Sequence, residues 1–436
     1  MINRIQHAIV VVFLLGNFSL AFAAPPKVTR FTLSNGIQVV NLYVEDSTDV
    51  CIFSYLPLGL VADGKAKTQW SHLIEHLVLR TTGPISSYVE RNGQTTHHGM
   101  HLDFIGTTDN WQHGLELQAK WLSNSPLSET DLVEELPKAL SELDFVTNNL
   151  HTGLFAMAAW NQVFRHGETD IAMRGAIESA ELSELQAYRN RHLVQVDRVL
   201  LCVIGGIEPE ALQLAMAEQL GHINLTPNAL PKATATPVHE KDQRATWDVN
   251  VTHYMETYAI PNATHENYPA FFVAHMLLNQ LLMMDTELKQ LTGSIFCGAD
   301  LVTPEQTYLY VTAALKPDSD VEKVKQRIGQ LVNQLKQPEN NAQVAMIAPA
   351  LSMQFSSPVD IEMVMQQHKP AGMTETMMLG NIGLQWGMLE YQYGDTLPHL
   401  AKAFANVSAD DVADVVNRYL TEDKQMTLLL TPRVLK

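Results

Sequence analysis

The sequence predicts a fold of mixed helices and strands arranged as two homologous domains, and three observations carry that prediction. The chain has 436 residues, of which 46% are hydrophobic and 17% are charged, so large folded cores are expected. Segments with strand and helix periodicity alternate along its length. The motif Asn-Arg-His-Leu at 190–193 returns as Asn-Arg-Tyr-Leu at 417–420, each time after an amphipathic helix and before an apolar strand.

The sequence of the first half predicts a series of strands and helices. Two strands between residues 30 and 42 flank Asn35-Gly36, a dipeptide that favours a tight hairpin turn. Residues 49–58 form a further apolar strand. The later elements of this half are predicted as helices at 128–149, 184–192 and 209–220 and a strand at 198–204, which Gly205-Gly206 turns into the last helix.

A second internal likeness, of a strand, a turn and a helix, relates residues 200–220 to residues 308–335. Together the two likenesses indicate homologous domains of about 200 residues each. We expect these domains at 28–226 and 243–436. The segment 227–242 between them is rich in Pro, Ala, Thr and charge, as linkers are.

The N-terminus, residues 1–23, has the features of a secretory signal peptide. Arg4 precedes an apolar run, and Ala21-Phe22-Ala23 forms a small-x-small cleavage site. The alternative is a membrane anchor, but the apolar run is short and Asn17 follows it closely. We therefore expect an exported protein without a membrane anchor, located in a bacterial periplasm or, alternatively, secreted.

Charge and cysteine content exclude several classes of protein. The 29 basic and 47 acidic residues give a formal net charge of −18, which argues against nucleic acids and anionic membranes as partners. An exported chain with three cysteines is not a disulfide scaffold. Of Cys51, Cys202 and Cys297, the first two lie in apolar strand-like segments, where buried free thiols are common.

The most specific local pattern is His-Leu-Ile-Glu-His at residues 72–76, the inverted form of a zinc-protease motif. On a helix, His72 and His76 lie on one face, one turn apart, and can offer two nitrogens to one tetrahedral zinc. Glu75 projects beside them, where a carboxylate can take a proton from water. The alternative is a pair of histidines that simply pack on a Leu-rich helix.

Two histidines need a third protein ligand, and the residues alone leave its identity open. The predicted helix at 128–149 contains Glu134, Glu135 and Glu142. Glu135 and Glu142 are seven residues apart, which places them on nearly the same helical face. Pro137 lies between them and predicts either a kink or the start of a new helix. Solvated acids on an amphipathic helix are the alternative.

These motifs resemble the pitrilysin/insulinase family of zinc metallopeptidases, in its shorter two-domain form that includes the mitochondrial processing peptidase subunits. The matching segments are 71–80, the pair Glu135 and Glu142, 165–175, 201–212, 258–261 and the residues from 267 onward. The resemblance implies an α+β fold of two homologous α/β-sandwich domains. Each would be a mostly antiparallel sheet with helices packed on one face, and the two would enclose a chamber for an unfolded peptide.

The resemblance also implies a role for each motif residue. His72, His76 and Glu142 would bind one Zn²⁺ per chain. Glu75 would be the general base that activates water and later passes its proton to the leaving amine. Glu135 would support the catalytic site by orienting a ligand.

The sequence departs from the family in the second domain. Lys289 stands where the family has a substrate-binding Arg, and Phe296 stands where it has a Tyr. Lys lacks the planar fork of Arg, and Phe lacks the hydroxyl donor of Tyr. In the first domain the stretch 93–103 shows no obvious Asn-Ala pair of the family's substrate-binding strand. We expect the histidines of that stretch to be exposed loop residues rather than ligands; they are His97, His98 and His101.

The sequence therefore predicts an exported zinc endopeptidase that acts on peptides or unfolded segments, as a heterodimer or homodimer with a homologous chain. Glu75 favours this reading, because a structural zinc site has no use for a base. The alternative is a catalytically weak or inactive member that serves as a peptide-binding or assembly subunit, which Phe296 favours. Zinc storage or sensing is a third reading, based only on the histidine content.

Overall fold

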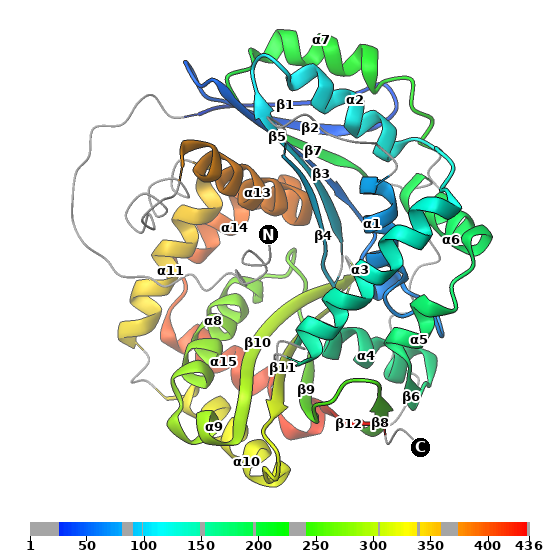
Figure 1. Cartoon of the computed structure of the whole chain (residues 1–436). Helices are drawn as coiled ribbons and strands as arrows, with labels where there is room; N and C mark the ends of the chain where they lie inside the picture. Colours follow the sequence, from blue (N-terminus) through cyan, green and yellow to red (C-terminus); the bar gives the residue numbers. More distant parts are fainter. Residues whose placement is uncertain are drawn as a thin grey trace.

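The computed structural model describes residues 26–80, 90–97, 99–148, 153–194, 198–225, 241–303, 306–337, 341–358 and 374–433. Two six-stranded sheets, each with helices against it, make up the fold (Figure 1). Most strand pairs in both sheets are antiparallel, so the predicted α+β class is confirmed. The predicted signal peptide and nearly all of the predicted linker lie outside the described residues, and the domain boundaries stay a prediction.

The first sheet has the strand order β1-β2-β7-β3-β5-β4. Its β1–β2 hairpin turns through Gly36 at a φ of 91°, a conformation that suits glycine, as the Asn-Gly pair predicts. The β2–β7 contact is parallel. The strands are β1 (Lys27–Thr32), β2 (Gln38–Tyr43), β3 (Asp49–Leu56), β4 (Glu90–Thr95), β5 (Met100–Thr107) and β7 (Leu200–Gly205).

The second sheet has the strand order β10-β11-β9-β12-β8-β6. Its last strand, β6, comes from the first half of the sequence, so the two halves share this sheet. The β12–β8 and β8–β6 contacts are parallel. The strands are β6 (Asp170–Ile171), β8 (Asp242–Trp247), β9 (His253–Ile260), β10 (Thr292–Thr303), β11 (Gln306–Leu315) and β12 (Gln425–Pro432).

The internal repeat is visible in the strand orders. The run β2-β7-β3-β5-β4 has the same chain order and the same parallel first contact as β8-β12-β9-β11-β10. The repeated motifs at 190–193 and 417–420 precede β7 and β12, which are equivalent strands. The second likeness related β7 to β11, which are not equivalent, so that part of the prediction was wrong. A strand, a turn and a helix form too common a unit to identify equivalent strands.

Each sheet has helices of its own half on one face. In the first half these are α1, α2 and α7, and in the second half α8, α10 and α15. The helices of the first half are α1 (Trp70–Arg80), α2 (Trp111–Leu122), α3 (Glu129–Asn148), α4 (Gly153–His166), α5 (Met173–Glu178), α6 (Leu182–Arg189) and α7 (Pro209–Gln219). Those of the second half are α8 (Tyr268–Met284), α9 (Thr286–Leu291), α10 (Val321–Gln334), α11 (Asn341–Ser356), α13 (Glu375–Tyr393), α14 (Leu397–Phe404) and α15 (Ala409–Tyr419).

The opposite face of each sheet is covered by a helix of the other half, which the sequence did not predict. Helix α13 of the second half lies against β3 and β7 of the first sheet, and Tyr55 donates a hydrogen bond to its Leu384 carbonyl at 2.8 Å (Figure 1). Helix α4 of the first half lies against the second sheet, where Trp160 Nε1 donates to Thr257 Oγ1 at 3.0 Å. Strand β3 is buried along seven of its eight residues, so both of its faces need a cover.

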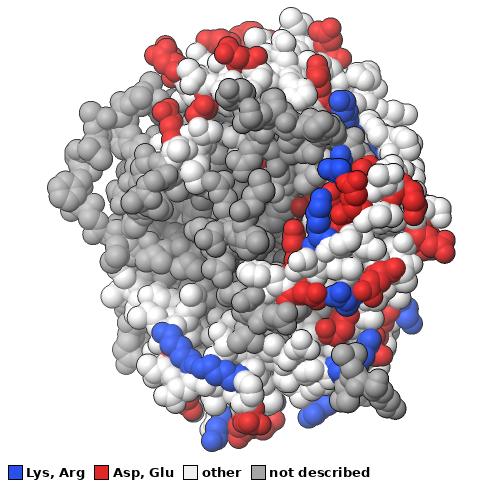
Figure 2. All heavy atoms as spheres, viewed as in Figure 1, with Lys and Arg blue, Asp and Glu red and all other residues white. Residues whose placement is uncertain are grey.

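Other features of the described chain agree with an ordinary folded protein. Cys51, Cys202 and Cys297 are buried, and none of the three forms a disulfide bond. No helix among the described residues is long and apolar enough to cross a membrane. Figure 2 shows acidic side chains spread over the top and right of one face, with basic side chains between them on the right. This distribution is typical of a solvated acidic surface.

Candidate metal centre

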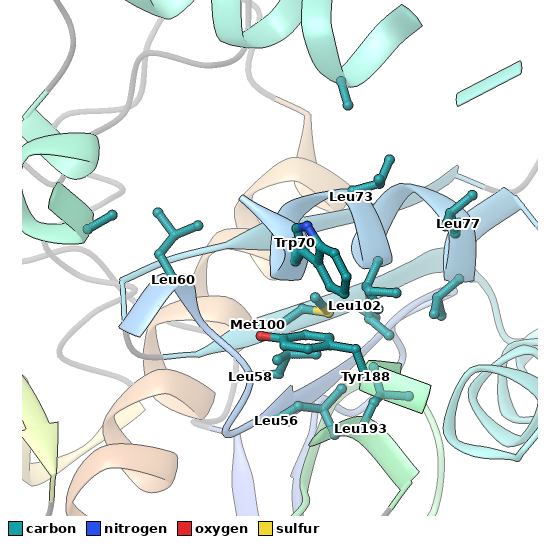
Figure 3. Close-up of a cluster of buried hydrophobic side chains, with 14 of the residues drawn as sticks. Leu56, Leu58, Leu60, Trp70, Leu73, Leu77, Met100, Leu102, Tyr188 and Leu193 are labelled. Atoms are coloured by element: carbon teal, nitrogen blue, oxygen red, sulfur yellow. The ribbon is translucent and has the colours of Figure 1, made fainter. Parts of the chain in front are cut away.

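Helix α1 holds the predicted motif in a fixed orientation because its apolar face is buried. Trp70, Leu73 and Leu77 are buried in the same apolar core as Met100 and Leu102 of β5, and Figure 3 shows the Trp70 ring directed toward these two residues. The 3.6-residue period then places His72 and His76 together on another side of the helix, one turn apart. Both of these side chains are largely but not completely buried, at 17% and 12% exposure.

Three ligand atoms meet beside α1. The Nε2 atoms of His72 and His76 lie 3.3 Å apart. Glu142 Oε2 lies 3.5 Å from His72 Nε2 and 3.6 Å from His76 Nε2. Among the described residues, this is the group of His, Cys, Asp and Glu side chains whose spacing suits a metal ion.

The geometry of this triangle fits zinc. Ligand atoms about 2.0–2.2 Å from a tetrahedral zinc lie about 3.3–3.6 Å from one another, which is the range of the three distances observed. Two imidazole nitrogens and one carboxylate oxygen are also a donor set typical of catalytic zinc sites, which keep the fourth position for water. The three residues therefore fit the metal that the motif predicts.

Glu142 comes from α3, which packs against α1. The helix runs without interruption from Glu129 to Asn148 with Pro137 inside it, so Pro137 does not start a new helix. Burial raises the pKa of Glu142, but the bonds and charges of His72 and His76 outweigh it, so the net pKa lies well below its usual range. The third ligand candidate is thus ionised at neutral pH.

Glu135 lies behind the ligands, on a side of α3 that faces away from solvent. Its Oε2 lies 3.4 Å from His76 Nδ1, and its Oε1 accepts from Lys138 at 2.6 Å. A carboxylate on Nδ1 favours the tautomer in which the other nitrogen, Nε2, is free to bind a metal. Glu134, one residue earlier, instead pairs with Arg80 on the surface and does not join the site.

Glu75 is held beside the triad by β4, the edge strand of the first sheet. Its side chain is buried, and its Oε2 accepts from Thr95 Oγ1 at 2.7 Å. A Cβ atom at Gly93 would come within 3.1 Å of Glu75 Oε1, so the strand approaches this close only because the residue is glycine. Sequence reasoning missed both residues, although a glycine inside a strand is a signal of close approach.

The site is strongly negative around His76. Burial lowers the pKa of His76, but Glu142, Glu75 and Glu135 raise it by a larger amount. The net pKa therefore lies above its ordinary value. The same carboxylates would attract a divalent cation, which would displace a proton from the imidazole.

The residues predicted from the second domain do not join the triad. Lys289 is exposed on the short helix α9, which Figure 1 shows at the lower left, away from α1. Phe296 is half-buried on β10, edge to face with Tyr310. No contact in the described residues brings Lys289 and Phe296 to each other or to the three ligands, and their substrate-binding role stays a prediction.

The expectation of exposed histidines in the stretch 93–103 was wrong. His97 is 2% exposed and His101 is 4% exposed, while His98 lies outside the described residues. His101 sits on β5, with Nδ1 2.7 Å from Asp103 Oδ1 and Nε2 3.1 Å from Gln94 Oε1. The reason for His101 is that it lies on β5, whose first five residues are all buried, so both faces of this part of the strand are covered. His97 lies in the turn between the paired strands β4 and β5 and is buried there.

Sequence and structure comparisons find similarity to known peptidases. The family model described as Peptidase M16 inactive domain matches residues 179–346. The zinc protease PqqE of Helicobacter pylori is 22% identical over 435 residues, with 93% of each chain covered. A solved protease from Helicobacter pylori has a TM-score of 0.65 at 17% identity, covering 94% of this chain and all of that one. Pitrilysin has a TM-score of 0.60 at 14% identity, and this chain spans 45% of its length.

Proposed function

The chain belongs to the M16 family of peptidases, and from this premise we propose that it is an exported, zinc-dependent endopeptidase that hydrolyses peptides or unfolded polypeptide segments. The observation that carries the proposal is the triangle of His72, His76 and Glu142, at the spacing of zinc ligands, with the buried carboxylate of Glu75 beside it. A structural metal site has no need of such a carboxylate. Export rests on the signal-like residues 1–23.

The chemistry follows from the positions of these residues. Bound zinc would polarise the scissile carbonyl and make water acidic enough to attack at neutral pH. Glu75 takes the proton of the attacking water as the oxygen bonds to the carbonyl carbon. When the carbon–nitrogen bond breaks, Glu75 returns that proton to the leaving amine. Thr95 holds the carboxylate in place through both transfers.

An extended substrate is the natural ligand for this site. The triad lies next to β4, an edge strand of the first sheet, and α1 packs against that strand. Edge strands bind extended peptides through backbone hydrogen bonds, which depend on the conformation of the peptide more than on the identity of its side chains. We therefore propose that substrates are selected by their ability to extend rather than by one specificity pocket.

We further propose that the chain works with a homologous partner, as a heterodimer or homodimer. Lys289 and Phe296 replace the Arg and Tyr expected opposite the metal, and neither contacts the triad. A partner chain would supply the missing donors. Cleavage at full rate by a chain shown to be monomeric would contradict this part of the proposal.

The second candidate is a peptide-binding or assembly subunit without turnover. Phe296 favours it, because a phenyl ring cannot donate a hydrogen bond to a developing oxyanion. The description of the matched family model as inactive also favours it. That match begins at residue 179, however, after the last triad residue, so it describes a part of the chain without the ligands.

The test is to measure zinc content and peptide cleavage for the wild type and for Glu75→Gln. We expect both proteins to hold one zinc per chain, and the variant to lose about 10²–10⁴-fold in kcat, the usual contribution of a general base. Glu134→Gln is the matched control, since it makes the same chemical change on a surface carboxylate of α3 outside the site. It should leave both quantities nearly unchanged.

Each other outcome has a definite meaning. A wild type that binds no zinc would end the metallopeptidase proposal. A wild type that binds zinc and peptides but never cleaves them, alone or with a homologous partner, would establish the binding subunit. Unchanged cleavage by the Glu75→Gln variant would remove Glu75 as the base.

A further inference from the structure

The two ends of helix α1 are held in different ways. The C-terminal end is tied to α3 by Arg80, which pairs with Glu134 and lies 3.7 Å from Asp131. The Arg80 side chain is 40% exposed, and exposed ion pairs hold geometry weakly. The N-terminal end, by contrast, is tied by a single buried carboxylate, Asp63, which is 1% exposed.

Asp63 collects four hydrogen bonds at the start of this helix. Its Oδ2 accepts from the backbone N–H of Gln69 at 2.8 Å. Its Oδ1 accepts from the backbone N–H of Ser71 at 3.0 Å, the Ser71 hydroxyl at 2.9 Å and the Tyr188 hydroxyl at 2.7 Å. Ser71 directly precedes the ligand His72, so these bonds fix the backbone next to the metal site.

The backbone that Asp63 holds is strained. Gln69 has a φ of 76°, a conformation that L-residues rarely adopt, and its side-chain amide is buried without a hydrogen-bond partner among the described residues. Such a residue persists only where its surroundings fix it. The hydrogen bond from its N–H to Asp63 is one of the contacts that does so.

Two further contacts connect this anchor to the rest of the molecule. Tyr188 of α6 stacks edge to face with Trp70, the first residue of α1, as Figure 3 shows. The backbone carbonyl of Asp63 accepts from Gln162 of α4 at 3.1 Å. The start of α1 is thus fixed relative to α6 and to the helix that covers the second sheet.

Burial of this charge is costly. It raises the pKa of Asp63 to about 7, although the hydrogen bonds from Tyr188, Ser71 and Gln69 lower it. A residue kept only for packing would not need a carboxyl group, because an apolar side chain of the same size costs less to bury.

We infer that Asp63 is the positioning residue that sets the two histidines of α1 at ligand distance from Glu142 of α3. This inference rests on the proposed zinc site. The ligands come from two helices, and the site forms only if α1 keeps its place relative to α3 within a few tenths of an ångström. Asp63 touches no ligand atom and acts through the backbone of residues 69–71.

The test compares Asp63→Asn with Asp285→Asn in the full-length protein. An asparagine keeps the shape but turns an amide N–H₂ toward donors, so it loses at least part of the four-bond anchor. Asp285 is the matched control: its side chain is 6% exposed and caps the start of α9, far from the triad, by accepting from the Leu288 N–H. The readouts are the zinc dissociation constant, by competition with a chelator, and the melting temperature of the metal-free protein.

We expect Asp63→Asn to raise the zinc dissociation constant about tenfold or more, within the range known for residues that orient metal ligands. Asp285→Asn should lower the melting temperature of the metal-free protein but change the zinc dissociation constant less than about twofold, since its ligand geometry is intact. If both variants lower only the melting temperature, Asp63 is merely structural and the inference fails.

Two milder variants keep the test decisive if Asp63→Asn does not fold. Ser71→Ala and Tyr188→Phe each remove a hydroxyl donor to Asp63 and leave the carboxylate in place. We expect each to weaken zinc binding about two- to threefold, less than the full tenfold range. Unchanged zinc affinity in both would overturn the inference. A wild type without zinc affinity would instead contradict the proposed function, so the two failures are distinguishable.

Discussion

Helices α1 and α8 occupy equivalent places in the two halves, yet among the described residues only α1 carries histidines of the candidate metal centre. Each follows the central strand of its sheet and precedes the edge strand. Helix α8 contains no Asp, Glu, Lys or Arg, and its polar residues bind the edge strand: His275 donates to the carbonyl of Cys297, and Asn279 accepts from its N–H. On α1, the two histidines face Glu142 of a neighbouring helix instead.

This difference shows what the shared fold leaves undetermined. Both halves place a helix beside an edge strand, and both use polar side chains there. In the second half those side chains form hydrogen bonds with backbone groups of the edge strand, which stabilises the fold. In the first half, Glu75 bonds a side chain of the edge strand, and the histidines meet a second helix. The direction in which the polar side chains point, rather than the topology, separates a structural helix from one that carries a candidate metal site.

The largest effect is expected from deleting a histidine on each helix. His72→Ala removes one of three ligands, so zinc affinity should fall by more than the about 100-fold that loss of an orienting residue can cost. His275→Ala removes one hydrogen bond to a backbone carbonyl, so it should lower the free energy of unfolding by about 1 kcal/mol and leave zinc affinity unchanged. Chelator competition and denaturant unfolding measure the two quantities. Equal loss of zinc in both variants would refute the distinction between the helices.

A smaller effect is expected where the halves pack on each other. A Cβ at Gly387 of α13 would lie 2.6 Å from the Tyr55 ring, so Gly387→Ala should lower the free energy of unfolding by about 1–3 kcal/mol through overpacking. Gly329 of α10 is the control, because nothing lies within 4 Å of its Cβ position. Gly329→Ala should raise the free energy of unfolding by about 0.5–1 kcal/mol. Two variants of equal stability would show that the contact between the halves is loose.

The smallest effect is expected at the two edge strands. A Cβ at Gly93 of β4 would press on Glu75 at 3.1 Å, so Gly93→Ala should lower kcat about tenfold by displacing the base, with zinc affinity unchanged. Gly298 of β10 is its counterpart, where a Cβ would meet the Tyr310 ring at 2.4 Å. Gly298→Ala should lower the melting temperature. A Gly93→Ala variant with wild-type kcat and a lower melting temperature would mean that β4 only supports the fold.

The ligand triad could be predicted because its information is local. His72, Glu75 and His76 lie within two turns of one helix, and Glu135 and Glu142 lie within two turns of another, so helical periodicity alone groups them. The spacing of residues along a helix is the same in any tertiary structure. The meeting of the two helices needed the family resemblance, because no local pattern relates residue 76 to residue 142.

The rest of the site could not be predicted because it depends on contacts between distant segments. Thr95 reaches Glu75 only after β4 has docked on α1, and Asp63 reaches Ser71 only because the chain reverses before the helix. His101 was misplaced for a different reason. His101 alternates with the apolar residues Met100 and Leu102, and this alternation predicts an exposed side chain at position 101. In the structure both faces of the strand are buried, so His101 is buried too.

The exchange of α4 and α13 has a consequence for the order in which the protein can form. A chain is made from its N-terminus, so all strands of the first sheet are synthesised before α13. Until then, Phe53, Tyr55, Cys202 and Ile204 have no cover on one face of that sheet, since α13 is what packs on them. The first half by itself therefore lacks a cover for this face of its sheet. Without α13 the first half would expose this apolar face, and exposed apolar surface favours association, so the docking of α13 is part of how this protein reaches its folded form.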